Sequence, residues 1–184
     1  MKRLPVEVTG ISACAPYQGY VVVLKEKEGK RLLPIFIGAP EANNIHLLLQ
    51  GLKYLRPLTY DLFHSLLEAA GAKVERITVT DLRDNTFYAE VSLRTGRDQV
   101  HEIDARPSDA IALAIKTQAP IYVMASVLDE AGLIGEETGQ RQEIAETVRA
   151  LNQQLSQAIE KEAYEEAAKI RDQIRELEEK VRTI

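Results

Sequence analysis

The stretch Asp104-Ala105-Arg106-Pro107-Ser108-Asp109 decides how the chain is organised, because a strand pattern ends there and a helix pattern begins. The run from Ala110 to Ile115 that follows is apolar on almost every helical face, which predicts a buried helix. Two carboxylates, a guanidinium and a hydroxyl are thus gathered at the start of a helix. Such a junction suits either a helix cap or a site that handles an anion or a metal.

Both interpretations of the junction are open. In the structural one, Pro107 takes the first helical position and Asp109 the third, where a carboxylate can bond back to the N–H of the cap residue. Arg106 then bridges Asp104, or Asp61 on a neighbouring helix. In the chemical one, the same side chains act on a substrate.

Strand and helix patterns continue on both sides of the junction. Three strands between Val74 and Ile103 predict a meander with a turn at Asp84-Asn85, and residues 20–24 and 32–37 predict two further strands. One helix is expected after Gly38-Ala39-Pro40 and another after Thr59, a good N-cap. A short strand at 120–124 and a short helix at 128–132 follow the buried helix. The predicted fold class is α+β, a mixed or antiparallel sheet packed with two to three helices and followed by a C-terminal α-helical hairpin.

The C-terminal part of the chain has a composition of its own. Residues 141–184 contain no Gly and no Pro, and their apolar residues recur at spacings of three and four. We therefore expect a first domain at 1–135, a linker at 136–145 and a helical hairpin at 146–184. A hairpin of this size is too small for an independent core, so it should pair with a second copy, with the main domain or with another protein.

Composition and charge narrow the possible functions. The chain has 184 residues and a net charge of −5, which argues against binding nucleic acid through a broad basic face. Cys14 is the only cysteine, so an intramolecular disulfide and a cysteine-based zinc site are excluded, as fits a reducing cytoplasm. The N-terminal residues do not resemble a signal peptide, and no membrane association is expected. Motifs of ATPases, serine hydrolases and zincins are absent from the sequence.

The C-terminal segment resembles the UVR motif, the helical hairpin of the B and C subunits of bacterial excision-repair nucleases. The matching residues are Leu151, Leu155, Ile159, Tyr164-Glu165-Glu166-Ala167-Ala168, Arg171-Asp172, Ile174 and Leu177-Glu178. In that family the motif mediates pairing between proteins. The resemblance therefore implies a bacterial protein with a UVR-containing protein as a possible partner.

The first 135 residues or so resemble the bifunctional nuclease domain, a family named for plant members described as degrading both DNA and RNA. The matching residues are Leu33-Pro34-Ile35, Ile37-Gly38, Glu41-Ala42, Arg56-Pro57-Leu58-Thr59, Asp61-Leu62, Phe87-Tyr88-Ala89 and Ile103 to Ala110. The order of these segments agrees with the family over nearly the whole domain. One position departs, because Tyr60 stands where a His commonly follows the Thr of the Arg-Pro motif.

This resemblance implies a nuclease that hydrolyses phosphodiester bonds of DNA or RNA with low sequence preference. Its catalytic residues would be Asp104, Asp109 and Arg106, with Arg56 and Ser108 binding phosphate. A Mg²⁺ or Mn²⁺ ion would be held by Asp104, Asp109, Glu41 and Asp61, activating water and stabilising charge on phosphorus.

Two functions from different classes are therefore carried forward. The first is a cytoplasmic nuclease, expected to form a homo-oligomer and to act on nucleic acid. The alternative is a non-catalytic adaptor that recruits a partner through its UVR hairpin.

Overall fold

The computed structural model of the protein describes residues 2–14, 19–52, 54–96, 99–134, 147–148, 150–157, 159 and 164–183. The chain divides into two compact units, Met1–Leu133 and Ile134–Ile184. The linker expected at 136–145 lies outside the described residues.

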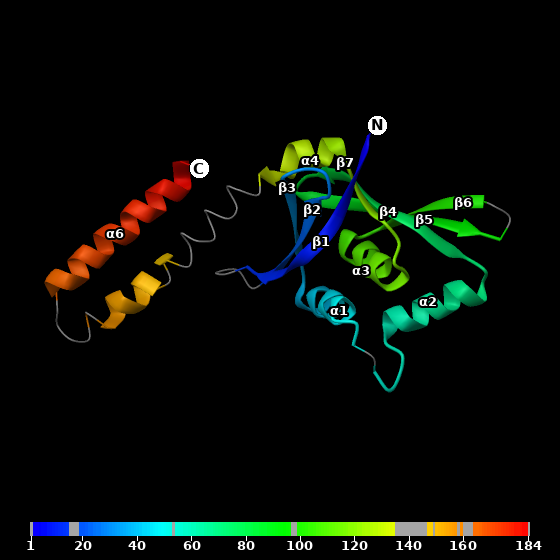
Figure 1. Ribbon diagram of the computed structural model, residues 1–184, viewed down its shortest axis with the longest axis horizontal. Helices are drawn as coiled ribbons and strands as arrows, with labels where there is room; N and C mark the ends of the chain where they lie inside the picture. Colours follow the sequence, from blue (N-terminus) through cyan, green and yellow to red (C-terminus); the bar gives the residue numbers. More distant parts are fainter. Residues whose placement is uncertain are drawn as a thin grey trace. The chain divides into compact units, whose positions relative to one another are not determined.

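A single eight-stranded sheet organises the first unit (Figure 1), with the strands in the order β6-β5-β4-β7-β1-β2-β3-β8. Its strands are β1 (Arg3–Ala13), β2 (Tyr20–Glu26), β3 (Arg31–Ile37), β4 (Lys73–Arg83), β5 (Thr86–Thr95), β6 (Gln99–Ala105), β7 (Ile121–Met124) and β8 (Leu133–Ile134). Antiparallel pairs dominate, and β4 pairs with β7 in parallel. The sheet is therefore mixed, which confirms the predicted α+β class.

The predicted meander is confirmed as β4, β5 and β6. Asp84 and Asn85 connect the first two strands with φ values of 47° and 59°. Positive φ at both central residues defines the two-residue turn that suits the twist of a hairpin, and Asp and Asn tolerate it best after Gly.

The shortest of the inner strands, β7, lies in the middle of the sheet, between β4 and β1. Its Ile121 and Val123 are buried, with their registered neighbours Ile77 and Val79 on β4. Because β6 lies at the sheet edge, the connection from β6 to β7 has to return to the centre. This connection carries the junction helix across one face of the sheet.

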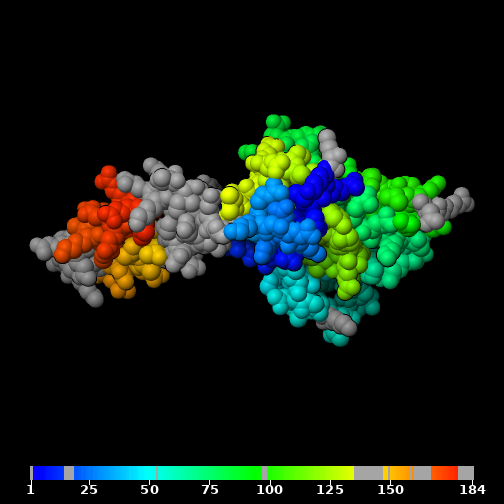
Figure 2. Space-filling model, turned by 45° about the horizontal axis from the view of Figure 1, so that its top comes forward, coloured from blue at the N-terminus to red at the C-terminus, as the bar shows by residue number. Residues whose placement is uncertain are grey.

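The described part of the first unit contains four helices: α1 (Ala39–Leu49), α2 (Thr59–Ala69), α3 (Pro107–Thr117) and α4 (Ala125–Ala131). Helix α3 packs on β4 and β5, and both α1 and α2 pack on α3. Figure 2 shows the yellow-green atoms of α3 beside the cyan atoms of α1. From Ala110 to Ala114 every residue of α3 is buried, which confirms the predicted buried helix.

Helix α2 differs from α3 because none of its residues is buried. The expectation that Thr59 caps it is wrong, since Leu58 is the N-cap residue and Thr59 is already helical. Leu58 has no side-chain acceptor, and the cap is made instead by Asp61, whose Oδ2 accepts from the Leu58 N–H at 2.8 Å. This is the reciprocal half of a capping box.

The second unit contains the predicted helical hairpin. Residues described between 147 and 159 are helical, and α6 (Tyr164–Thr183) follows them. Ala167, Ile170 and Ile174 of α6 are buried and pack with Val148, Leu151 and Leu155. No helix in the described parts of either unit is long and apolar enough to cross a membrane.

Candidate functional site

The junction that the sequence singles out is the N-terminus of α3. Arg106 is its N-cap residue with φ −66° and ψ 142°, and Pro107 opens the helix. The Arg106 carbonyl accepts hydrogen bonds from the N–H groups of Asp109 and Ala110, at 3.1 and 3.0 Å. Asp109 is therefore at the third helical position, as the spacing predicts.

The side chains at this N-terminus form a cluster that joins three helices. The Asp109 carboxylate accepts from Arg106 Nε at 2.7 Å and from the Tyr60 hydroxyl at 3.0 Å. Arg106 Nη1 donates to Glu41 Oε1 at 3.1 Å. We call Arg106, Asp109, Glu41 and Tyr60 the Arg106 cluster. The cluster corrects the expectation that Arg106 bridges Asp104 or Asp61, because its partners are Asp109 on its own helix and Glu41 on α1.

Charge and burial define what each member of the cluster can do. The hydrogen bond and the charge of Asp109, with help from Glu41, raise the pKa of Arg106, so its guanidinium is a permanent cation. Burial, and then the hydrogen bond to Asp109, raise the pKa of Tyr60, so the phenol is a neutral donor. The Arg106 side chain is 66% exposed, and its Nη2 has no partner among the described residues.

A hollow of about 280 Å³ lies beside the exposed side of Arg106. Ser108 and Glu41 line it, together with Phe36 and Phe87. Phe36 is 68% exposed although it lies on a strand, so its ring is available at the rim. The structure thus brings Arg106, Ser108 and Glu41 to one hollow, while Asp109, which is bonded to Arg106, lines a second hollow.

Asp104 opens onto a different hollow. This one has about 360 Å³ and lies between α2, α3 and the strands β5 and β6. Asp104, Asp109 and Tyr60 are among its polar residues, and the rest of its wall is largely apolar. Asp104 is exposed at the end of β6 and takes no part in the hydrogen bonds of the Arg106 cluster.

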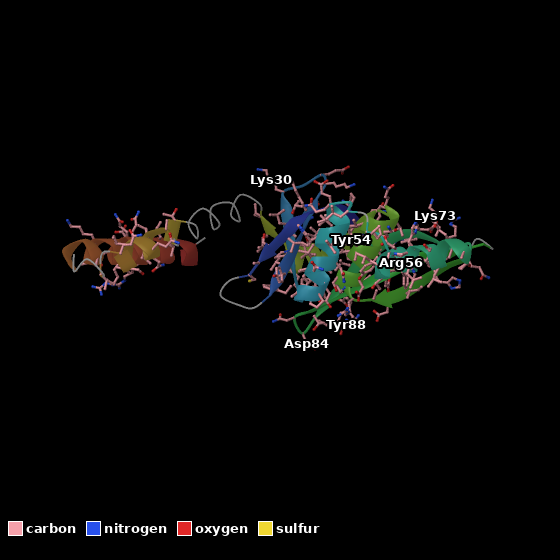
Figure 3. All side chains as sticks on the ribbon, turned by 90° about the horizontal axis from the view of Figure 1, so that it is seen from below. Lys30, Tyr54, Arg56, Lys73, Asp84 and Tyr88 are labelled. Carbon is pink, nitrogen blue, oxygen red and sulfur yellow. The ribbon has the colours of Figure 1, made fainter. Side chains whose placement is uncertain are left out.

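Asp61 and Arg56 lie apart from the cluster. Asp61 pairs with Lys116 near the end of α3, and this contact, followed by the Leu58 N–H, lowers the pKa of the Asp61 carboxyl. Arg56 is exposed in the connection between α1 and α2, where Figure 3 labels it with Tyr54. Neither residue is hydrogen-bonded to the Arg106 cluster among the described contacts.

The expected metal ligands do not converge. Glu41 and Asp109 are both bound by Arg106, and Asp61 is bound by Lys116. Within the described residues, no three His, Cys, Asp or Glu side chains are grouped so that they could hold a metal ion. The described arrangement therefore does not fit a carboxylate metal centre, and metal binding by these residues stays a prediction.

Two residues that sequence reasoning did not nominate take direct part in these contacts. Tyr60 holds Asp109, and Lys116 holds Asp61. The available signal for Tyr60 was its position directly after the Arg-Pro-Leu-Thr motif. Lys116 carried only the weak signal of a cation in the last turn of a helix.

Comparison with known proteins finds one family for each of two parts of the chain. Residues 22–136 match the family model of the bifunctional nuclease domain, and residues 145–180 match that of the UvrB/UvrC motif. An uncharacterised protein of Mycobacterium tuberculosis is 41% identical over 129 residues, covering 70% of this chain and 76% of that protein.

Plant relatives are more distant. Bifunctional nuclease 1 of rice is 26% identical over 117 residues, covering 62% of this chain and 35% of that protein. Bifunctional nuclease 2 of Arabidopsis thaliana is 27% identical over 111 residues, covering 59% of this chain and 33% of that protein. The chain thus spans about a third of the length of these plant relatives.

Proposed function

The chain belongs to the bifunctional nuclease domain family, and on that premise we propose that it is a cytoplasmic nuclease. It would hydrolyse phosphodiester bonds of DNA or RNA with little sequence preference. We propose the Arg106 cluster, at the N-terminus of α3, as its reaction centre.

The observation that carries this proposal is the way Arg106 is held. Its Nε and Nη1 are fixed by Asp109 and Glu41, while Nη2 has no described partner and the side chain is 66% exposed. A guanidinium fixed on one side presents its remaining N–H donors in a set direction, which suits the oxygens of a phosphate. Ser108 lines the same hollow and is 7% exposed, and we propose its hydroxyl as a second donor to phosphate.

Recognition of the rest of the substrate would be sequence-tolerant. Phe36, exposed at the rim of the Arg106 hollow, offers an aromatic face on which any base can stack. The protein as a whole is acidic, so a broad electrostatic contact with long nucleic acid is not expected. Binding would instead depend on a few local contacts to phosphate and base.

Asp109 would act as the general base. Each of its oxygens accepts one described hydrogen bond, and a carboxylate oxygen has room for a second. It would take the proton of a water whose oxygen attacks phosphorus, while the bond to the leaving oxygen breaks and that oxygen takes a proton from solvent. Tyr60, which stays protonated, would hold the carboxylate in position.

The cleavage assay includes a divalent ion, to which we assign no binding site. Mg²⁺ or Mn²⁺, when bound, would offset charge on the phosphate and activate water. Because the described carboxylates are bound by Arg106 and Lys116, no step is assigned to the ion. Asp104 is the exposed carboxylate whose substitution tests metal dependence most directly.

The proposal is tested by cleavage of labelled single-stranded DNA and RNA with Mg²⁺, with Mn²⁺ and with EDTA. We expect wild-type protein to cleave both, and Arg106→Gln and Asp109→Asn each to lower the rate by at least about a hundredfold. Asp104→Asn should lower the rate only in the presence of the metal if it is a ligand.

Arg31→Gln is the matched control, because Arg31 is also held by two carboxylates, Glu26 and Asp129, on another part of the unit. Its rate should stay within about twofold of wild type. Equal loss in the Arg31 and Arg106 variants would mean that the effect is structural. Absence of cleavage by folded wild-type protein under all three conditions would refute the nuclease proposal.

The match of residues 145–180 to the UvrB/UvrC motif favours a second candidate, a non-catalytic adaptor. In that case the hairpin would bind a UVR-containing protein. A purified UVR-containing subunit should then be retained by the immobilised full chain, and Ile159→Glu, which changes an exposed apolar residue of the hairpin, should weaken retention. Unchanged retention by that variant, or none by the wild type, would count against this candidate.

A further inference from the structure

Helix α2 presents an apolar face that the rest of the first unit does not cover. Leu62 is 56% exposed, Leu66 60% and Phe63 48%. On its inner side, Tyr60 and Leu67 pack against the core. The helix is therefore apolar on two sides, and only one of them is in contact with its own unit.

The connection before α2 extends this surface. Leu52, Tyr54 and Leu55 are 58%, 49% and 104% exposed, and Leu58 at the N-cap is 39% exposed. We call these four residues together with Leu62, Phe63 and Leu66 the α2 ridge. Figure 3 labels Tyr54 within it.

The α2 ridge lies between two hollows. One has about 670 Å³ and is lined by Leu52, Tyr54, Leu55 and Leu58, with Leu47 and Leu48 of α1. The other is the hollow of about 360 Å³ lined by Phe63 and Leu67, with Ile103 of β6. Polar residues also line both hollows, Asp61 and Lys116 in the larger and Asp104 and Asp109 in the smaller. A protruding apolar helix beside a partly apolar hollow can seat against a second copy of itself.

The size of the ridge agrees with a standard protein–protein interface. Its exposed side chains amount to roughly 700 Å² of largely apolar surface, near the roughly 800 Å² that each partner contributes to a standard interface. Monomeric proteins seldom expose a continuous apolar patch beyond roughly 300–600 Å². A face of this size needs a partner that is always present, and a second copy of the chain meets that condition.

The described charges around the ridge are few and mostly paired. Asp61 is paired with Lys116 and Glu68 with His64, which leaves Arg56 as the exposed cation beside the ridge among the described residues. Nucleic acid and anionic membranes are bound by clustered cations, and the described residues of the ridge are apolar. An apolar face of this kind favours a protein partner with a similar face.

We propose that two copies of the chain associate through the α2 ridge about a two-fold axis. In such an isologous interface the same patch serves both partners, so a helix flanked by hollows can seat in the hollow of its counterpart. The hairpin of the second unit is a weaker candidate, because Ala167, Ile170 and Ile174 are already buried within it. Because Asp109 and Tyr60 line the smaller hollow, we place the partner helix in the larger one, and the proposal does not rest on the nuclease activity.

Sedimentation equilibrium of the full chain tests the proposal. The wild-type protein should have twice the chain mass of 20.6 kDa, and Leu62→Glu/Leu66→Glu should have the chain mass itself. Both positions are exposed and Glu is a good helix former, so the variant should keep its helix content. We expect its dimerisation to be weaker by at least about a hundredfold.

Ile159→Glu is the matched control, since it makes the same change at an exposed apolar residue of the hairpin, and it should remain dimeric. If the double variant loses far-UV circular dichroism, Leu66→Gln replaces it, with an expected weakening of about tenfold. A monomeric or higher-order wild type, an undiminished dimer in the ridge variants, or a dimer lost only in Ile159→Glu would each overturn the proposal.

Discussion

Asp61 connects the start of α2 to the end of α3 through one carboxylate. Its Oδ2 accepts from the Leu58 N–H at 2.8 Å, and its Oδ1 pairs with Lys116. Because Leu58 offers no side-chain acceptor, Asp61 makes the described side-chain contact at the α2 N-terminus. The Lys116 contact and then the Leu58 N–H lower the pKa of the Asp61 carboxyl below its ordinary value.

This lowered pKa predicts a pH-dependent loss of stability for Asp61→Asn. At pH 7 the variant should lose about 1 kcal/mol of unfolding free energy, from a cap contact and a partly exposed ion pair. Because the pKa of Asp61 is lower in the native state than in the unfolded state, the ionised carboxylate stabilises the native state above the unfolded pKa, which is about 3.9. This stabilisation is lost as the pH falls below about 3.9 toward the native pKa. Urea denaturation from pH 3 to 8 should therefore show the difference shrinking below about pH 4.

Glu68→Gln supplies the control for the Asp61 prediction. Glu68 lies on the same helix, is 68% exposed and is paired with His64 at 3.5 Å. Its unfolding free energy should stay within about 0.5 kcal/mol of wild type at every pH. An Asp61→Asn difference that is independent of pH would show that the ionised carboxylate is not what stabilises the native state.

At the residue scale, contacts between residues close in the sequence could be predicted, whereas contacts between distant residues could not. The helical positions of Pro107 and Asp109 depend on three consecutive residues, so their spacing was sufficient. Glu41 is 65 positions from Arg106, and Tyr60 is 49 from Asp109, so only the packing of α1 and α2 on α3 brings them together. Asp104 and Asp109 are close in sequence, yet Asp104 takes no part in the hydrogen bonds of the Arg106 cluster, because the chain changes from strand to helix between them.

At the scale of elements, α3 and α1 end in opposite ways although both have Gln at the C-cap. Gln118 has φ 58° and ψ 28°, the left-handed conformation, whereas Gln50 has φ −75° and ψ −11°. A side chain with a Cβ is strained in the first case and relaxed in the second. In α1 the left-handed position falls one residue later, on Gly51, with φ 62°.

Glycine substitutions at these two caps should therefore have opposite signs. Gln118→Gly should raise the unfolding free energy by about 0.5–1 kcal/mol, because Gly removes the left-handed strain. Gln50→Gly should lower the unfolding free energy by a similar amount. No left-handed strain is relieved at this position, and Gly raises the conformational entropy of the unfolded chain. Chemical denaturation of both variants is the measurement, and a destabilised Gln118→Gly would contradict the argument.

The type of an element could be predicted from the sequence where a clear pattern or start signal was present. The order of the strands in the sheet could not. The ten-residue alternation of β5 is typical of a strand, whereas the six-residue apolar run from Ala110 to Ile115 needed Pro107 as a helix start to distinguish a buried helix from a buried strand. Four-residue β7 carried a weak signal, yet it lies at the centre of the sheet. Its place depends on pairing with β1 and β4, which are distant in sequence.

At the scale of the whole molecule, the two units have very different cores. The first buries residues from six strands and from the helices α1, α3 and α4 in one continuous cluster. The described core of the second consists of Ala167, Ile170 and Ile174 with three partly buried neighbours. The composition changes near residue 141, where Gly and Pro disappear, whereas the division into two compact units falls between Leu133 and Ile134.

The small core of the hairpin makes it the weaker unit, and Ile170→Asp should unfold it alone. Placing an unpaired carboxylate at a position that is 7% exposed costs several kcal/mol, roughly all that a core of this size supplies. Calorimetry of the wild type should show two transitions, and the variant should lose the weaker one together with part of its helical circular dichroism. Gln173→Asp, exposed on the same helix, should keep both transitions. A fall in the melting temperature of the remaining transition would mean that the sheet unit draws stability from the hairpin, because a core complete in itself cannot respond to a substitution elsewhere.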